Sequence, residues 1–430
     1  MTTQLSRRVL TRGVGFSVLR DPKFKFNRLS VNFIVPLEEE TASDNAMLVL
    51  MMRHGCRTCP DFTEFNRKLY GLYGAELSGE VLKLGANQVL SFSITMIDDR
   101  FTLDSERLLR ECALLLRDVV TAPNIEDGAF PATEFEVERQ YLIDTIEAEI
   151  NDKRTWALAQ CRRIMGRGDA ASRRKYGTVE GARSVTPGST AKAWEKLIAD
   201  AGVEIFYTGS GDPTDAEEVF ADTFAAREHE SLYVPVDIVP AAEKVQEAVE
   251  RLDVVQSKLV LGFRTGERPP FGQQAAIRLA VAILGGTPSS KLFLNVREKR
   301  SLCYYCSARY DRLGAIMMVE SGVEHQNVEP AQEAILAELE DLRRGIFTDE
   351  TMEETRLQLV NSLRAISDSS GSIEDWYLNR VLMGEMSTPQ EEIEQFERVT
   401  RGEVVEAAKG ITLDTVYLLT QKQEDNADEN

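Results

Sequence analysis

Histidine is scarce in this 430-residue chain, which contains three: His54, His229 and His325. No two of them are close in sequence. A catalytic zinc ion needs three protein ligands, and two histidines four residues apart can share one ion on a helix face. The sequence therefore contains no histidine pair of the kind that forms such a site.

Long apolar runs and an excess of basic residues are also absent. No apolar run approaches the roughly 18 residues that cross a bilayer. The apolar segment after Arg7 and Arg8 is interrupted by Arg12 and Arg20, so we expect no signal peptide and a cytoplasmic protein without a membrane partner. The formal charge of −20 argues against a nucleic-acid partner, because phosphate backbones require a basic face.

The six cysteines include two pairs with Cys-x-x-Cys spacing, Cys56/Cys59 and Cys303/Cys306. A zinc or redox site is one interpretation of each pair, and reduced, partly buried thiols are the other. If Cys303 and Cys306 lie in a strand, residues three apart point to opposite faces and cannot share a metal. Cys56 and Cys59 follow a helix and lie in a loop, so metal binding stays open for that pair.

The length and composition fit a soluble globular protein of two or more domains, with 43% hydrophobic and 28% charged residues. The segment 227–247 contains two prolines and no sustained apolar period, so it is the best candidate for a boundary. We expect an N-terminal lobe at 1–226, a linker at 227–247, a C-terminal lobe at 248–422, and a disordered acidic tail at 423–430.

The two halves resemble each other at a shift of 230 residues. Gly55 falls on Gly285, and the apolar segment 46–52 falls on 276–282. Leu29, Val31 and Phe33 fall in the same way on Leu259, Leu261 and Phe263. Strand, loop, helix and glycine therefore recur in the same order. The sequence predicts an α+β fold made of two homologous two-layer lobes, each an antiparallel sheet with helices.

Local patterns predict most of the elements. Strands are expected near 13–19, 28–35, 80–83, 89–96, 203–207, 256–265 and 415–420, and a strand pair at 310–323. Helices are expected near 45–54, 62–73, 105–122, 133–165, 187–197, 274–284, 329–344 and 350–367. Asp44 is expected to cap the first helix, and capping boxes are expected at 388–391 and 400–403.

The segment 284–305 predicts a helix end, a Gly-Gly turn, a short amphipathic helix and a strand. Arg297 falls in that short helix, and Tyr304 follows seven residues later in the strand. From spacing alone, Arg297 could simply pair with a local carboxylate such as Glu298, and Tyr304 could pack in a sheet.

The context of these two residues, LGGTPSSKLF at 284–293 and VREKRSLCYY at 296–305, resembles the C-terminal half-signature of the inverted-zincin metallopeptidases, the insulinase/pitrilysin family. Catalytic members bind zinc with a His-x-x-Glu-His helix and a later Glu. They grip the substrate peptide with an Arg and a Tyr seven residues apart. The resemblance implies that Arg297 and Tyr304 bind substrate and that two homologous lobes face each other across a chamber.

The zinc half of the signature is missing. Aligning the family helix on Gly55 places Ala46, Val49 and Leu50 at the two histidine and one glutamate positions, and none of these can bind a metal. The third family ligand maps onto Thr145. We therefore expect no catalytic residue, no metal ligand and no cofactor in this chain alone.

Three nearby residues could be mistaken for ligands. Glu147 and Glu149 are expected to lie on the solvated face of a charged helix. His54 is expected to interact with the last carbonyls and the dipole of its own helix.

The resemblance is to catalytically degenerate bacterial members of the YmfF type, which occur with a zinc-bearing sibling. It implies a heterodimer in which Arg297 and Tyr304 bind a peptide substrate while the partner supplies zinc. The alternative is a non-catalytic chamber or scaffold protein that binds a peptide or protein, with a link to elongation-factor-P modification that the residues neither support nor oppose. A Cys56/Cys59 metal or redox protein is a third interpretation. The peptide, its cleavage site, lobe motion and homodimer formation stay open.

Overall fold

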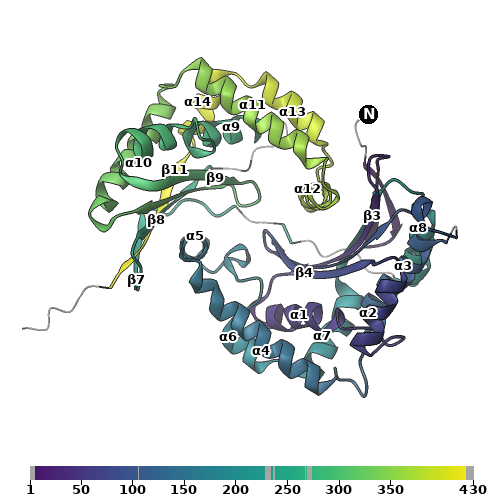
Figure 1. Ribbon diagram of the computed structural model, residues 1–430. Helices are drawn as coiled ribbons and strands as arrows, with labels where there is room; N and C mark the ends of the chain where they lie inside the picture. Colours follow the sequence, from purple (N-terminus) through teal and green to yellow (C-terminus); the bar gives the residue numbers. More distant parts are fainter. Residues whose placement is uncertain are drawn as a thin grey trace, which may run out of the picture. The chain divides into compact units, whose positions relative to one another are not determined.

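The chain folds into two compact units, seen in a computed structural model that describes residues 5–104, 106–227, 234–235, 238–266, 268 and 274–422 (Figure 1). Unit 1 comprises residues 1–147, 173–235 and 366–388, and unit 2 comprises residues 148–172, 236–365 and 389–430. These units differ from the linear halves expected from the sequence because two helical segments are exchanged between the halves. The expected acidic tail and part of the expected linker lie outside the described residues.

Unit 1 contains a six-stranded sheet in the order β1-β2-β6-β3-β5-β4. The central strand β3 carries Leu29, Val31 and Phe33, all fully buried as the alternating pattern predicts. The strands are β1 (Leu5–Thr11), β2 (Val14–Arg20), β3 (Phe26–Pro36), β4 (Glu76–Leu84), β5 (Asn87–Ile97) and β6 (Gly202–Gly209). Its helices are α1 (Glu39–Met52), α2 (Phe62–Gly71), η1 (Asp99–Phe101), α3 (Leu108–Thr121), α4 (Ala132–Ala148), α6 (Val179–Ser184), α7 (Pro187–Asp200), α8 (Thr214–Phe224) and α12 (Ser370–Met383).

Unit 2 contains a five-stranded sheet in the order β7-β11-β8-β10-β9. Its strands are β7 (Gln246–Leu252), β8 (Ser257–Arg264), β9 (Cys303–Asp311), β10 (Ile316–Val323) and β11 (Thr412–Gln421). Its helices are η2 (Glu149–Asn151), α5 (Lys153–Gly166), η3 (Ala170–Ser172), α9 (Gln274–Gly285), η5 (Leu292–Lys299), η6 (His325–Asn327), α10 (Val328–Arg343), α11 (Asp349–Ile366), α13 (Pro389–Arg398) and α14 (Arg401–Lys409).

The two sheets have the same topology once β1 is set aside. In unit 1, β6 lies between β2 and β3 and pairs in parallel with β2. In unit 2, β11 lies in the same way between β7 and β8 and pairs in parallel with β7. The remaining pairs are antiparallel. The predicted duplication is therefore confirmed, and the sheets are mixed rather than purely antiparallel.

Each sheet packs on one face against helices that follow its own strands. In unit 1 this core joins β3 and β5 to helices that include α1, α3, α4 and α7, which Figure 1 shows on one side of the sheet. Gly285 ends α9 in unit 2 at a point where the chain comes very close to β9. A Cβ atom added there would lie 2.6 Å from the backbone nitrogen of Ala308, so only glycine fits.

The opposite face of each sheet packs against one exchanged helix. In unit 1, α12 places Ile373, Tyr377 and Leu378 against strand residues such as Phe206. In unit 2, α5 places Ala157, Cys161 and Met165 against Val260 and Leu419. Each unit is therefore completed by a helix from a distant part of the sequence, α12 in unit 1 and α5 in unit 2. A domain defined as one continuous stretch of sequence cannot include such a helix.

A buried carboxylate also links each exchanged helix to its sheet. Glu374 on α12 accepts hydrogen bonds from Arg28 Nε at 2.9 Å and from Ser30 Oγ at 2.5 Å on β3. Glu320 on β10 accepts two hydrogen bonds, both at 2.7 Å, from the guanidinium of Arg154 on α5. Because both carboxylates are almost fully buried, each helix is held by a charge pair that water screens poorly.

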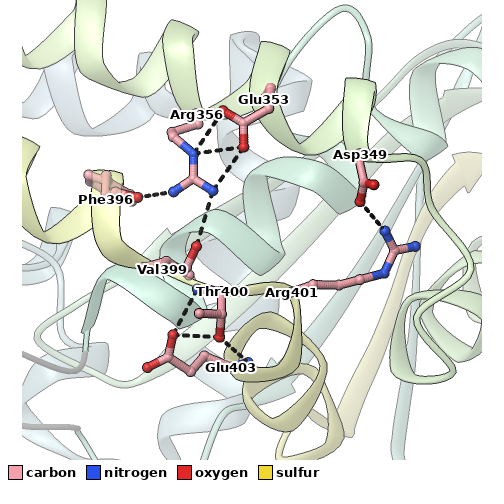
Figure 2. A network of polar contacts seen from close by, with 8 residues as sticks. All are labelled: Asp349, Glu353, Arg356, Phe396, Val399, Thr400, Arg401 and Glu403. Atoms are coloured by element: carbon pink, nitrogen blue, oxygen red, sulfur yellow. Dashed lines mark hydrogen bonds and ion pairs between the residues drawn. The ribbon is translucent and has the colours of Figure 1, made fainter.

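The helical layer of unit 2 is tied together by arginines that reach helix ends (Figure 2). Arg356 on α11 donates to the carbonyl oxygens of Phe396 and Val399, which close α13. Thr400 and Glu403 form the predicted capping box at the start of α14. These contacts satisfy backbone groups that a helix end leaves unpaired.

The predicted elements are largely present, with errors at some boundaries. The helix expected at 133–165 is divided into α4 and α5, which belong to different units. Helix α1 begins at Glu39 instead of near Asn45, so Asp44 lies inside the helix and does not cap it. Its carboxylate instead accepts hydrogen bonds from the hydroxyls of Ser189 and Thr190 at the start of α7. Among the described residues, no helix has the length and hydrophobicity to span a bilayer.

Candidate functional site

Arg297 lies near the end of η5 in unit 2, the short amphipathic helix that the sequence predicts. Leu292 and Val296 are fully buried and hold one side of η5 against the unit. The Arg297 side chain is 38% exposed, and its guanidinium carbon lies 4.5 Å from the ring centroid of Phe293. This stacking restricts the guanidinium without satisfying its hydrogen-bond donors.

A tight turn connects η5 to β9. Ser301 has a φ of 52°, a left-handed conformation that is uncommon outside glycine. The Leu302 N–H donates to the carbonyl oxygen of Val296 at 3.2 Å and closes the turn. The chain therefore reverses direction directly after the helix, and the first residues of β9 return beside Arg297.

Tyr304 is presented by an irregularity in the pairing of β9 with β10. Tyr305 pairs with Gly322, and Cys303 pairs with the next residue, Val323, so Tyr304 is an extra residue on β9. Such β-bulges bend a strand and redirect a side chain. Tyr304 is 52% exposed as a result, and the expectation that it could pack within the sheet is not met.

Arg297 and Tyr304 line one pocket with a volume of about 360 Å³. Its wall also includes Glu298, Cys303 and Glu324. The Tyr304 hydroxyl donates to Glu324 Oε1 at 3.0 Å, and this hydrogen bond raises the pKa of Tyr304. The structure therefore brings together the two residues that the sequence singled out, and adds a carboxylate beside each of them.

The contact between Arg297 and Glu298 is loose. Arg297 Nη1 lies 3.6 Å from Glu298 Oε1, which is beyond the length of a normal hydrogen bond. The predicted alternative of a local ion pair is thus present, but it leaves guanidinium donors for a ligand. A planar guanidinium beside a phenol suits the recognition of a peptide carbonyl or carboxylate.

The bulge also changes the relation between Cys303 and Cys306. The prediction that these residues point to opposite faces is wrong, because the extra residue Tyr304 shifts the alternation of side chains by one position. The pKa of Cys303 is lowered to about 7, chiefly by a hydrogen bond from the Cys306 thiol, with further lowering by Ser321 and the charge of Arg297 against an opposing effect of burial.

The positions that align with the family's zinc ligands lie in unit 1 and are mainly apolar. Ala46 and Val49 on α1 are buried in the hydrophobic core, and Leu50 packs against it. On α4, the Thr145 hydroxyl donates to the backbone carbonyl of Tyr141 at 2.7 Å. Each of these side chains has a packing or backbone role, and none of the apolar three offers a metal an electron pair.

His54 forms a contact that the sequence did not predict. Its Nε2 lies 2.7 Å from Glu138 Oε1 on α4, so its main partner is a carboxylate and not a carbonyl of its own helix. Arg53 Nη2 lies 3.4 Å from the other oxygen of Glu138. Burial acts to raise the pKa of Glu138, but the hydrogen bonds and charges of His54 and Arg53 outweigh it and keep the pKa below the usual value. A three-residue charge cluster joins α1 to α4.

The remaining candidates have ordinary environments. Glu147 is exposed and its carboxylate lies 3.2 Å from Arg183, as expected for a solvated helix face. Cys56 and Cys59 form a small backbone bridge and are both buried. Burial, followed by the neighbouring Cys56, raises the pKa of Cys59. Within the described residues, no three His, Cys, Asp or Glu side chains are grouped as metal ligands.

Sequence reasoning missed Glu324 and Glu138. Glu324 follows β10, and the antiparallel pairing of β9 with β10 brings it back to Tyr304. A hairpin model of 303–323 would have pointed to it. Glu138 lies within a helix that carries several charged residues, so the sequence offered no signal that this one is buried.

Comparisons with known proteins agree with this architecture. Residues 184–359 match the family model "Peptidase M16 inactive domain". The chain is 25% identical to "Probable inactive metalloprotease YmfF" of Bacillus subtilis over 410 residues, covering 95% of this chain and 96% of that protein. It is 27% identical over 161 residues to "Uncharacterized zinc protease YmxG" of the same organism, covering 36% of this chain and 38% of that protein.

Solved structures are similar over nearly the whole chain. A conserved protein from Enterococcus faecalis has a TM-score of 0.90 and 28% identity, covering 98% of this chain and 100% of that one. A peptidase M16 inactive domain from Pseudomonas fluorescens has a TM-score of 0.78 and 17% identity, covering 97% and 98% of the two chains. Residues 184–359 therefore match the inactive-domain model of peptidase family M16, the inverted-zincin (insulinase/pitrilysin) family, and the chain is similar over nearly its whole length to YmfF, whose name describes a probable inactive metalloprotease.

Proposed function

We propose that this chain is the non-catalytic, peptide-binding subunit of a two-chain zinc metallopeptidase. The observation that carries the proposal is a pocket of unit 2 whose lining includes both Arg297 and Tyr304. A protein that had lost every peptidase role would have no need of this pair at its surface.

Arg297 would hold a carbonyl or carboxylate oxygen of the bound peptide. Its guanidinium is partly exposed, is oriented by Phe293, and has only a long contact with Glu298. A charge-assisted hydrogen bond to an oxygen that gains negative charge during hydrolysis would be stronger than one to the resting carbonyl. This residue would therefore contribute to turnover as well as to binding.

Tyr304 would act as a neutral donor to the same peptide. In the unliganded chain its hydroxyl donates to Glu324. A peptide carbonyl would have to replace Glu324 as the acceptor, and the exposed position of Tyr304 on the bulge leaves room for that exchange. Glu324 would thus hold the phenol ready and compete modestly with substrate.

The hydrolytic chemistry would come from a partner that carries a His-x-x-Glu-His zinc site. In this chain the corresponding positions Ala46 and Val49 are buried and apolar. The similarity to YmxG, whose name describes a zinc protease, supports the existence of such relatives. A zinc site in the partner would supply the activated water for hydrolysis, and this chain would hold the peptide through Arg297 and Tyr304.

The test measures peptide hydrolysis by this chain mixed with a zinc-bearing M16 protein from the same genome. We expect Arg297→Ala to lower kcat/KM about 100-fold, in the range for loss of one oxyanion donor, and Tyr304→Phe to lower it about tenfold.

Matched controls are Arg300→Ala, which removes an exposed arginine from the end of the same helix, and Tyr70→Phe, which changes an exposed tyrosine of unit 1. Both should leave turnover unchanged. If the Arg297→Ala complex forms normally and keeps its rate, the chain is a scaffold that binds a peptide or protein without aiding hydrolysis.

A further inference from the structure

The bulge in β9 places two thiols on the same side of a strand. Cys306 pairs with Ser321, Tyr305 with Gly322 and Cys303 with Val323, so Tyr304 is the inserted residue between the cysteines. A regular strand would separate the side chains of residues three apart onto opposite faces. The insertion brings them back to one face of β9, because their partners Ser321 and Val323 are two residues apart on β10.

The two thiols have unequal surroundings. Cys303 is partly exposed and lines the pocket with Arg297, Glu298, Tyr304 and Glu324. Cys306 is 4% exposed. The pKa of Cys306 is raised well above its usual value, first by its hydrogen bond to Cys303 and then by burial, whereas that of Cys303 is lowered. An accessible thiolate next to a buried, protonated thiol is the arrangement in which one cysteine reacts first and the other resolves the product.

The other cysteines of the chain provide an internal contrast. Cys112 and Cys161 are buried, and burial raises the pKa of each thiol to about 12. Cys59 is also buried and its pKa is raised. Reactivity toward oxidants should therefore be concentrated at Cys303.

We propose that Cys303 and Cys306 are a reversible dithiol–disulfide pair that is oxidised by a peroxide, with Cys303 as the attacking sulfur and Cys306 as the resolving one. The pair borders the same pocket as Arg297 and Tyr304, but its oxidation is a separate chemistry from peptide hydrolysis.

The chemistry balances with hydrogen peroxide as the oxidant. The Cys303 thiolate attacks one peroxide oxygen, the O–O bond breaks, and Cys303 becomes a sulfenic acid while hydroxide leaves and takes up a proton as water. The Cys306 sulfur then attacks Cys303, the S–O bond breaks, and the hydroxyl leaves as a second water with the Cys306 proton. Two thiols and one peroxide thus give one disulfide and two waters, and a small dithiol returns two electrons and two protons.

The disulfide would weaken peptide binding at the pocket. This expectation rests on the proposed function. A disulfide requires its two Cα atoms to lie within about 7 Å, so it would fix the spacing of Cys303 and Cys306 on either side of the bulge that carries Tyr304. Bond formation also removes the thiolate whose charge faces Arg297. Because both peptide-binding side chains are affected, we expect oxidation to weaken peptide binding about tenfold, by analogy with the loss of one hydrogen bond.

The experiment treats the purified full chain with hydrogen peroxide at neutral pH, blocks the remaining thiols with iodoacetamide, and maps peptides by mass spectrometry. The expected product is a 303–306 peptide lighter by two hydrogens, restored by dithiothreitol, while Cys112 and Cys161 stay reduced. In Cys306→Ser the reaction should stop at a sulfenic acid on Cys303, trapped by dimedone. A Cys56→Ser/Cys59→Ser variant should still form the disulfide.

Two results would overturn the proposal that Cys303 and Cys306 form a dithiol–disulfide pair. One is a native chain in which Cys303 is alkylated no faster than an unstructured cysteine peptide, since we expect it to be on the order of tenfold faster at neutral pH. The other is peroxide treatment that oxidises Cys303 without engaging Cys306. Peptide affinity, measured separately on reduced and oxidised chain, tests the proposed function: a disulfide that forms in a chain that never binds peptide would leave the thiol pair standing and reject the peptide role.

Discussion

The charge pair between Arg154 and Glu320 gives the sharpest test of how the exchanged helix α5 is held in unit 2. Glu320 is 2% exposed and accepts two hydrogen bonds of 2.7 Å from Arg154, together with one of 3.1 Å from Ser307. Removing Arg154 would leave the carboxylate buried with Ser307 and a longer contact to Arg309 at 3.7 Å.

The expected cost of Arg154→Ala is about 3 kcal/mol of unfolding free energy. Removing one partner of a buried ion pair costs about 3–5 kcal/mol. The low end applies because Arg154 is 43% exposed and because Arg309 can partly replace it. The double change Arg154→Met/Glu320→Gln should recover at least half of the loss, since it removes the unpaired charge as well as the pair.

The assay follows urea unfolding by the fluorescence of Trp156, which lies on α5 and donates to Glu250 at 3.0 Å. The chain has three tryptophans, and the other two, Trp194 and Trp376, belong to unit 1. A Trp194→Phe/Trp376→Phe background therefore leaves a reporter in unit 2 alone. Arg344→Ala, which breaks an exposed helical pair with Glu340, is the control and should change stability by less than about 0.5 kcal/mol. A loss that small for Arg154→Ala would refute the reasoning.

Further predictions concern unit 1 and the bulge. The pKa of Glu138 is held below its usual 4.5 by His54 and Arg53, so its contribution to stability is present above that value and is lost as the pH falls below it. The stability of unit 1 should therefore fall less steeply with decreasing pH in Glu138→Gln than in the wild type. An unchanged pH dependence would contradict the role given to Glu138, His54 and Arg53. A Cβ at Gly322 would lie 2.4 Å from the Tyr305 ring, so Gly322→Ala should cost about 1–3 kcal/mol and alter the bulge. Gly371→Ala, with space around its position, is the control, and equal stability of the two variants in urea would count against the steric argument.

The sequence predicted most of the regular structure because apolar periodicity is strong where a face is buried. The alternating residues of β3 and β8 and the glycines at 55 and 285 located the repeat before any coordinates were known. The resemblance of residues 284–305 to a family signature then indicated Arg297 and Tyr304, and the structure places both at one pocket.

The errors come from features that local patterns do not encode. The exchange of α5 and α12 depends on contacts between distant parts of the chain, so contiguous boundaries could not express it. The bulge at Tyr304 is set by the pairing of β9 with β10, and one inserted residue reversed the expected geometry of Cys303 and Cys306. His54 likewise found its partner on α4, which is 84 residues away in sequence.

The most direct test of the central claim is a mixing measurement on the wild-type chain. The purified chain is assayed for bound zinc and for hydrolysis of a peptide library, first alone and then with a His-x-x-Glu-His relative from the same genome. We predict no zinc and no hydrolysis from this chain alone, and hydrolysis in the mixture well above that of the relative by itself. Zinc binding with hydrolysis by this chain alone, or a mixture that forms no complex and gains no activity, would contradict the account.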